Sequence, residues 1–235
     1  LDTVEAVDKL FYVRDALCLR REKLGESKAM LGFCGSPWTL ACYMIDGGSS
    51  PHFPKTVEWA QSSPKSFAQL MEKLTEVLIG YVKLQSQSGV DALQIFDSWN
   101  ALCTNSHVNE WSLQWIDQIA KEVSSDIPVI LYAKAPSERL NYLSNCKVSG
   151  ISIDHETDLA YARTTLPAHF TLQGNLDPAL LETNEETVEK TTLQLLNKMK
   201  GDAGHILNLG HGIRPQAKVE CMQALVQTVA EFSDS

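Results

Sequence analysis

Residues 31–50, LGFCGSPWTLACYMIDGGSS, decide how this chain is interpreted. They open with a short apolar run, 31–33, that predicts a buried strand, and Gly35, Ser36 and Pro37 end that run at once. The apolar pattern resumes over 38–45, and the Gly- and Ser-rich residues that follow predict a mobile loop over 47–54. A strand that runs into a Gly/Pro turn and then presents a tyrosine, here Tyr43, is typical of an active-site wall in a parallel α/β enzyme.

Strand-like and helix-like segments alternate along the rest of the chain. We expect strands at 31–33, 92–96, 128–132, 150–153, 170–173 and 205–209. We expect helices at 2–23, 63–89, 106–123, 138–143, 160–165, 183–199 and 219–232, with Ser63 capping the second and a capping box at 183–186 starting the sixth. Such alternation predicts a parallel sheet with right-handed crossovers. Six strands do not close a (β/α)8 barrel, so the pattern alone leaves an open doubly wound sheet as the alternative.

Length and composition limit the classes of function. The chain has 235 residues, 44% of them hydrophobic and 21% charged, which suits one large globular domain. We expect no membrane span, because no window approaches about 18 consecutive apolar residues. The net charge of −9 argues against nucleic-acid binding. The first residues lack the basic and apolar regions of a signal peptide, so we expect a cytoplasmic protein.

The spacing of the cysteines and glycines does not indicate a metal site or a nucleotide-binding motif. None of the six cysteines forms a Cys-x-x-Cys pair, so we expect reduced, buried thiols. His107 lies near Cys103 but has no further ligands at zinc-like spacing. No G-x-G-x-x-G or Walker motif follows any predicted strand, so no nucleotide cofactor is indicated.

Four segments, in order along the chain, resemble the uroporphyrinogen decarboxylase family. Residues 32–44 match the family pattern G-F-x-G-x-P-W-T-L-x-x-Y-M, and LQIFDS at 93–98, LQGNLDP at 172–178 and NLGHG at 208–212 are similar to its later strand motifs. The family has a TIM barrel. The resemblance therefore implies an α/β fold of the TIM (β/α)8 type, here incomplete, in which the six strands match the third to eighth βα units of one domain over 1–235.

Two N-terminal motifs of the family do not occur in these residues. Family members begin with Met-Arg-Gln-Ala-Gly-Arg and continue to a strand that ends in Phe-Ser-Asp, and the latter supplies the Asp that binds the pyrrole NH groups. An open barrel would expose edge strands and apolar interior. We therefore expect the native protein to carry an N-terminal segment of about two βα units. A truncated, non-catalytic relative is the alternative.

The resemblance implies an enzyme that removes CO₂ from the four acetate side chains of uroporphyrinogen III and gives coproporphyrinogen III in haem biosynthesis. It implies no cofactor, a tetrapyrrole as the partner molecule and a homodimer. A corrinoid-dependent methyltransferase of the same superfamily is the enzyme alternative, and such enzymes usually hold zinc through His and Cys at strand ends.

The site residues follow from the same motifs. Tyr43 and His211 are the candidate catalytic residues, and both are also expected, with Ser98, Phe33 and Phe96, to bind the substrate. A tyrosine or serine hydroxyl can donate to a substrate carboxylate, and an imidazole can hold a carboxylate or deliver a proton near neutral pH. From spacing alone, a tyrosine such as Tyr43 is more often a core residue with a backbone partner, and Ser98 could equally be a turn cap. A lone histidine such as His211 is more often structural.

Several neighbouring residues have lesser roles in this interpretation. Lys134 and Arg214, with His211, are the candidates for local positive charge near a polyanionic substrate. Asp97 is interpreted as a salt-bridge or turn residue, and Asn175 and Asp177 as residues that position a turn.

Overall fold

The computed structural model describes residues 3–134, 137–202 and 204–233. The chain divides into two compact units, Leu1–Gly150 and Ile151–Ser235, and each is described by itself. The interpretation of 1–235 as a single barrel domain stays a prediction.

Three parallel strands form the sheet of the first unit: β1 (Leu31–Gly35), β2 (Ala92–Asp97) and β3 (Val129–Ala133). Gly35 pairs with Phe96, and Phe96 pairs with Tyr132, so the three strands end at the same edge. All three lie within two residues of their predicted bounds. The prediction of a buried first strand holds for one face only, because side chains alternate along β1 and Phe33 is 63% exposed.

The segment after β1 is helical, which the sequence analysis did not predict. Residues Pro37–Asp46 form α3, and α4 (Pro54–Ser62) begins after the expected loop. Ser36 caps α3 by accepting a hydrogen bond from the Thr39 N–H, and Gly47 ends it in the left-handed region at φ 80°. Tyr43 is therefore held on a capped helix rather than in a loop.

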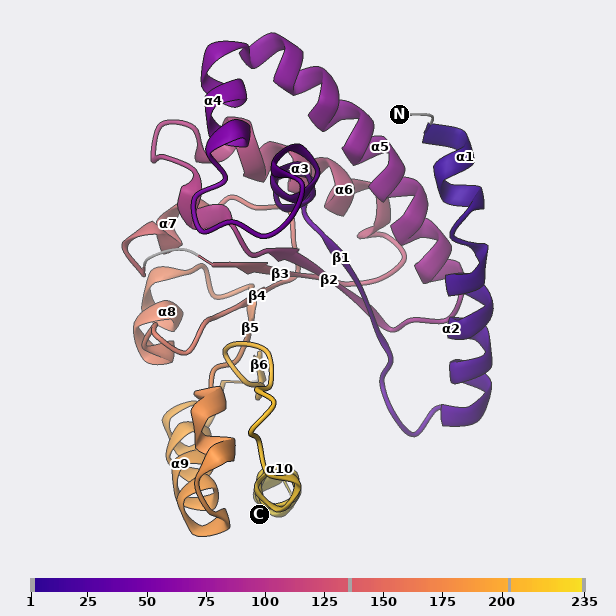
Figure 1. Ribbon diagram of the computed structural model, residues 1–235. Helices are drawn as coiled ribbons and strands as arrows, with labels where there is room; N and C mark the ends of the chain where they lie inside the picture. The colour runs from indigo at the N-terminus through magenta and orange to yellow at the C-terminus, as the bar shows by residue number, and fades with distance from the viewer. Residues whose placement is uncertain (1–2, 135–136, 203, 234–235) are drawn as a thin grey trace. The chain divides into compact units, whose positions relative to one another are not determined.

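Further helices cover one side of this sheet. They are α5 (Pro64–Gln87), a π-helical turn at Asn109–Leu113 and α6 (Gln114–Val123), and α3, α5 and α6 lie on the same side of β1–β3 (Figure 1). Ser63 precedes α5 but its side chain makes no capping hydrogen bond, so that expected cap is wrong. Trp38 and Trp111 stack at 5.3 Å in the core below these helices.

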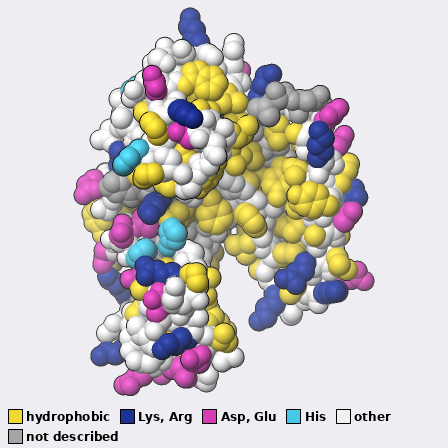
Figure 2. Space-filling view, in the orientation of Figure 1, with side chains coloured by type: hydrophobic (Ala, Val, Ile, Leu, Met, Phe, Trp, Pro, Cys, Tyr) yellow, Lys and Arg dark blue, Asp and Glu magenta, His cyan; other side chains and the backbone are white. Residues whose placement is uncertain are grey.

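The first predicted helix is divided into α1 (Thr3–Asp8) and α2 (Phe11–Leu24), with Asp2 outside the described residues. α2 buries no residue, and Phe11 and Tyr12 are 43% and 69% exposed. Figure 2 shows hydrophobic side chains gathered on the visible surface beside α2 and β1. The unit ends with a short 3₁₀ turn at Ser137–Arg139 and α7 (Leu140–Leu143), close to the helix expected at 138–143.

The second unit carries β4 (Gly150–Ser152, which begins at the boundary), β5 (Thr171–Gln173) and β6 (His205–Ile206). β6 is shorter than predicted, and the pairing continues only as an isolated bridge between Leu176 and Leu209. Its helices are α8 (Leu159–Thr165), a 3₁₀ turn at Pro178–Glu182, α9 (Glu185–Lys198) and α10 (Val219–Ser233). The last helices pack over a buried cluster of Leu176, Leu181, Val188, Cys221 and Leu225.

One helix start differs from its prediction. The side chain of Asn184, not of Thr183, accepts the hydrogen bond from the Thr187 N–H and caps α9. The Thr183 hydroxyl instead donates to the carbonyl of Leu180 at 2.7 Å, which ends the preceding 3₁₀ turn. The expected capping box at 183–186 is therefore wrong, and the Asn184 side chain caps the helix instead.

Five of the six cysteines are buried, as expected, and Cys18 is exposed, which was not expected. Burial raises the pKa of the Cys34 and Cys146 thiols to about 12, so both stay protonated near neutral pH. None of the helices in the described residues is long and apolar enough to cross a bilayer.

Candidate functional site

A buried carboxylate, Asp97, occupies the point where β1 and β2 end. Its Oδ1 accepts hydrogen bonds from the hydroxyls of Ser36 at 2.7 Å and Thr39 at 3.2 Å. Its Oδ2 accepts from the Asn100 amide at 2.7 Å and the Ser112 hydroxyl at 2.5 Å. Asp97 is completely buried, so four neutral donors replace the water that a carboxylate normally binds.

Of the two interpretations of Asp97, the salt bridge is wrong, since no Lys, Arg or His among the described residues forms an ion pair with it. The turn role fits, because the Asn100 amide, three residues later, donates to Asp97. Burial raises the pKa of Asp97, and the hydrogen bonds from Ser112, Ser36, Asn100 and Thr39 lower it in part. The carboxyl is a structural hub that joins β1, β2, the start of α3 and the π-helical turn.

Tyr43 lies on α3 beside this hub. Its side chain is 39% exposed, and its ring packs edge-on against Phe53 at 5.6 Å and Trp99 at 6.1 Å. The Trp38 indole N–H donates to the Trp99 carbonyl at 2.9 Å and fixes the backbone there. Within the described residues the Tyr43 hydroxyl has no hydrogen-bond partner, so the interpretation of Tyr43 as a core residue with a backbone partner does not fit.

Trp99 completes this aromatic cluster. Its ring meets Phe53 at 4.7 Å, and its buried indole N–H has no partner in the part of the chain that the structure describes. An unpaired buried donor is unusual in a folded protein. Trp99 directly follows Ser98, so the aromatic cluster and the candidate serine belong to one turn after β2.

Ser98 and two phenylalanines stand at the same edge. The Ser98 hydroxyl is half-buried and makes no hydrogen bond to any described residue. Phe33 packs edge-on against Phe96 at 6.2 Å, and Phe96 meets the ring of Tyr132 at 5.9 Å. These three rings come from neighbouring strands and form an apolar wall that is open at Phe33. The first unit thus brings together Tyr43, Ser98 and an aromatic surface.

The second unit builds its strand ends differently. Asp154, after β4, accepts hydrogen bonds from the N–H groups of Glu156 and Thr157 at 2.9 and 3.1 Å. Asn175, after β5, donates to the carbonyls of Asp154 and Thr157 at 2.8 and 2.6 Å. Two successive strand-end loops are thereby tied together, and the predicted positioning role of Asn175 is seen directly.

His211 lies in a third loop of this unit, the one after β6. A Cβ on the preceding Gly210 would lie 2.2 Å from the backbone nitrogen of His155, so only glycine fits there. The His211 side chain itself is exposed. Asp177 performs the expected turn role by accepting from the Ala179 N–H at 2.8 Å.

The two other candidates for local positive charge, Lys134 and Arg214, lie on the surface. Lys134 is exposed, and its backbone N–H donates to the Asp97 carbonyl at 3.2 Å. Arg214 is exposed and pairs with Glu182 at 3.5 Å, so part of its charge is already matched. No group of three or more His, Cys, Asp or Glu side chains that could hold a metal gathers in the described ranges.

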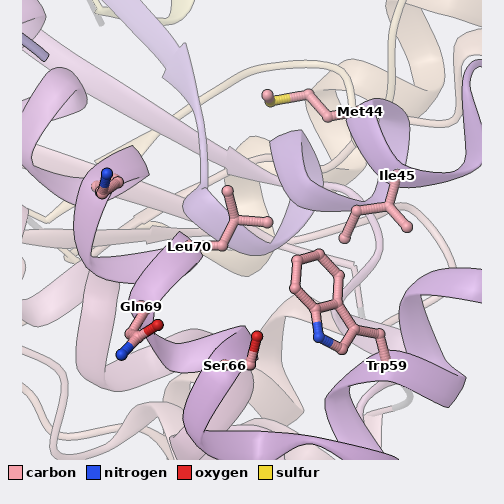
Figure 3. A pocket seen from close by; sticks show the side chains of 7 residues that line it. Met44, Ile45, Trp59, Ser66, Gln69 and Leu70 are labelled. Atoms are coloured by element: carbon pink, nitrogen blue, oxygen red, sulfur yellow. The ribbon is translucent and has the colours of Figure 1, made fainter. Parts of the chain in front are cut away.

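A groove on the helical side of the first unit is a different feature. It has a volume of about 450 Å³ and is lined by Met44, Ile45, Trp59, Ser66, Gln69, Leu70 and Lys73. Trp59, Ile45 and Leu70 face one another there from α4, α3 and α5 (Figure 3). It lies among helices rather than at the strand ends, and none of the candidate residues lines it.

Comparison with known proteins places these motifs in a family. The family model for uroporphyrinogen decarboxylase (URO-D) matches residues 1–232. A uroporphyrinogen decarboxylase of Ruthia magnifica subsp. Calyptogena magnifica is 36% identical, over 96% of this chain and 67% of its own length. That of Campylobacter lari is 40% identical, over 99% of this chain and 68% of its own. The chain thus spans about two thirds of the curated relatives it matches.

Among solved structures, a methyltransferase from Methanosarcina mazei superposes with a TM-score of 0.82 at 21% identity, over 94% of this chain and 64% of its own. At that identity the likeness shows a shared fold. It confirms the expected α/β fold of the TIM-barrel type, here with six strands. On the family match and the identities to curated relatives, the chain belongs to the uroporphyrinogen decarboxylase (URO-D) family.

Proposed function

We propose that the protein is a uroporphyrinogen decarboxylase that converts the four acetate side chains of uroporphyrinogen III to methyl groups without a cofactor, giving coproporphyrinogen III. The observation that carries this proposal is the strand-end edge of the first unit. In this unit the hydroxyls of Tyr43 and Ser98 lack partners among the described residues, and the exposed ring of Phe33 packs on Phe96, the strand residue two before Ser98. Family membership supplies the reaction.

The chemistry requires proton delivery and carboxylate binding. A pyrrole protonated on carbon becomes an electron sink. The bond between the acetate methylene and its carboxylate then breaks, CO₂ leaves, and the electron pair moves into the ring. A proton adds to the methylene carbon to complete the methyl group, and the proton first placed on the ring carbon is lost, which restores the pyrrole. Tyr43 and Ser98 donate hydrogen bonds to substrate carboxylates, and Phe33 and Phe96 pack against the macrocycle. His211 holds a carboxylate or delivers a proton.

Location and assembly belong to the same proposal. A cytoplasmic enzyme that acts as a homodimer fits the family resemblance. No membrane partner and no nucleic-acid partner are proposed, in keeping with the net charge of −9.

The test is a turnover assay of the full-length purified protein with uroporphyrinogen III and a chelator present, with the products separated by chromatography. We expect coproporphyrinogen III. Tyr43→Phe keeps the ring packing and removes one donor to a charged group, so kcat/KM should fall by about tenfold. Complete loss of activity on chelation, together with stoichiometric zinc, would favour a corrinoid-dependent methyltransferase. A folded protein without turnover would favour a non-catalytic relative.

A further inference from the structure

The carboxylate of Asp97 is the buried polar group that the proposed chemistry leaves without a role. It is fully buried, yet it sits one residue before Ser98 in the chain. Burying a carboxylate is costly, and replacing a buried ionic group by apolar residues is often neutral or stabilising. Stability alone therefore does not explain why a carboxylate lies here.

The first link runs from Asp97 to Tyr43. Ser36 donates to the Asp97 carboxylate and at the same time accepts from the Thr39 N–H at 3.0 Å, so the cap of α3 rests on Asp97. The Thr39 hydroxyl donates to the same oxygen. Tyr43 lies four residues after Thr39, one helical turn further along the same side of α3. The direction of the Tyr43 helix is thus fixed at its first turn by Asp97.

The second link runs from Asp97 to Ser98. The Asn100 amide reaches back to Asp97 Oδ2 at 2.7 Å and closes the turn that contains Ser98 and Trp99. The Ser112 hydroxyl, from the π-helical turn, donates to the same oxygen and lies 3.2 Å from the Asn100 amide nitrogen. The Trp99 ring in turn contacts Tyr43. Both candidate hydroxyls are thereby tied to one carboxylate through independent sets of hydrogen bonds.

We propose that Asp97 is a positioning residue that holds the Tyr43 helix and the Ser98 turn in one fixed arrangement for binding a substrate carboxylate. The catalytic part of this inference rests on the proposed decarboxylase function. Asp97 does not contact the substrate, because its side chain is completely buried beneath the residues that would.

The test is Asp97→Asn in the full-length protein. The amide keeps the shape, and the Ser36 and Thr39 hydroxyls can rotate to accept, so the protein should fold while the hydrogen bonds at the α3 cap rearrange. We expect kcat/KM per folded enzyme to fall by about tenfold, mostly through a higher KM. The matched control is Asp117→Asn. Asp117 is half-buried, whereas Asp97 is completely buried, and it accepts from the Lys147 N–H at 2.8 Å in the loop before β4, away from the strand ends. That variant should keep its KM.

Hydrogen exchange gives a readout that does not depend on activity. In Asp97→Asn, amides of residues 37–46 and 98–102 should exchange about tenfold faster, while those of α5 stay unchanged. An unchanged KM, or equal acceleration throughout the unit, would overturn the positioning role. If the wild-type protein lacks decarboxylase activity, the proposed function fails, and the exchange pattern alone decides whether Asp97 couples the two segments.

A second variant covers the case in which Asp97→Asn does not fold. Thr39→Val removes one donor and keeps the branched shape, so it should give the same exchange pattern with about a threefold rise in KM.

Discussion

The strand ends of the two units are held by different means. In the first unit the side chains of Ser36, Thr39, Asn100 and Ser112 converge on one buried carboxylate. In the second unit the bonds run between side chains and backbone, and Gly210 permits two backbones to touch. Removing a polar group at the strand ends should therefore destabilise the first unit most. Adding a side-chain atom where the backbones touch should destabilise the second unit most.

The largest effect is expected for Asp97→Ala, which leaves four buried donors without their acceptor. Unpaired buried donors cost about 1–3 kcal/mol each before relaxation, so the free energy of unfolding should fall by about 4 kcal/mol. Urea denaturation followed by fluorescence measures it. Ser112→Ala, which removes one donor and leaves the carboxylate three, is the control and should cost about 1 kcal/mol. Equal losses for the two variants would mean that Asp97 is not the centre of the network.

A smaller effect is expected for Gly210→Ala in the second unit. The new Cβ would meet backbone atoms of His155 at 2.2 and 2.7 Å, which cannot rotate away, so unfolding should become easier by about 2 kcal/mol. Gly212→Ala is the control, because nothing lies within 4 Å of its Cβ position, and it should stay within about 0.5 kcal/mol of the wild type. A stable Gly210→Ala protein would show that the two loops are not in close contact.

The smallest effect is expected in how the stability contributions of two aspartates, Asp97 and Asp158, change with pH. Burial raises the pKa of Asp97, so the folded state holds this proton more tightly and the Asp97 contribution to stability falls as pH rises above about 4. The pKa of Asp158 is lowered by its hydrogen bonds with Lys198 and the Tyr161 N–H. Its contribution is therefore present above about pH 4 and is lost as pH falls.

The free energy of unfolding of the wild type minus that of Asp97→Asn should decrease from pH 3 to 7. The corresponding difference for Asp158→Asn should increase over the same range. Urea titrations across this range check both. High salt should flatten the Asp158 curve first, because that pair is exposed and screened by ions. If the two stability differences changed with pH in the same direction, the opposite pKa shifts of Asp97 and Asp158 would be contradicted.

The sequence predicted most of the strands because short apolar runs bounded by Gly and Pro mark them well. It did not predict α3, because the apolar residues after Pro37 suit a buried helix and a strand equally. The Ser36 cap could have been recognised from Ser-Pro-x-Thr. The role of Asp97 could not, because its partners Ser36 and Thr39 lie 61 and 58 residues away in sequence. The need for glycine at 210 likewise depends on a backbone 55 residues earlier, which no local pattern records.

The central proposal is that Tyr43 and Ser98 of the first unit bind carboxylates of one tetrapyrrole. A crystal structure of the full-length protein with coproporphyrinogen III bound tests it most directly. We expect one macrocycle whose carboxylates accept hydrogen bonds from Tyr43 and Ser98 and whose face packs on Phe33. A macrocycle bound away from Tyr43 and Ser98 would contradict the site assignment.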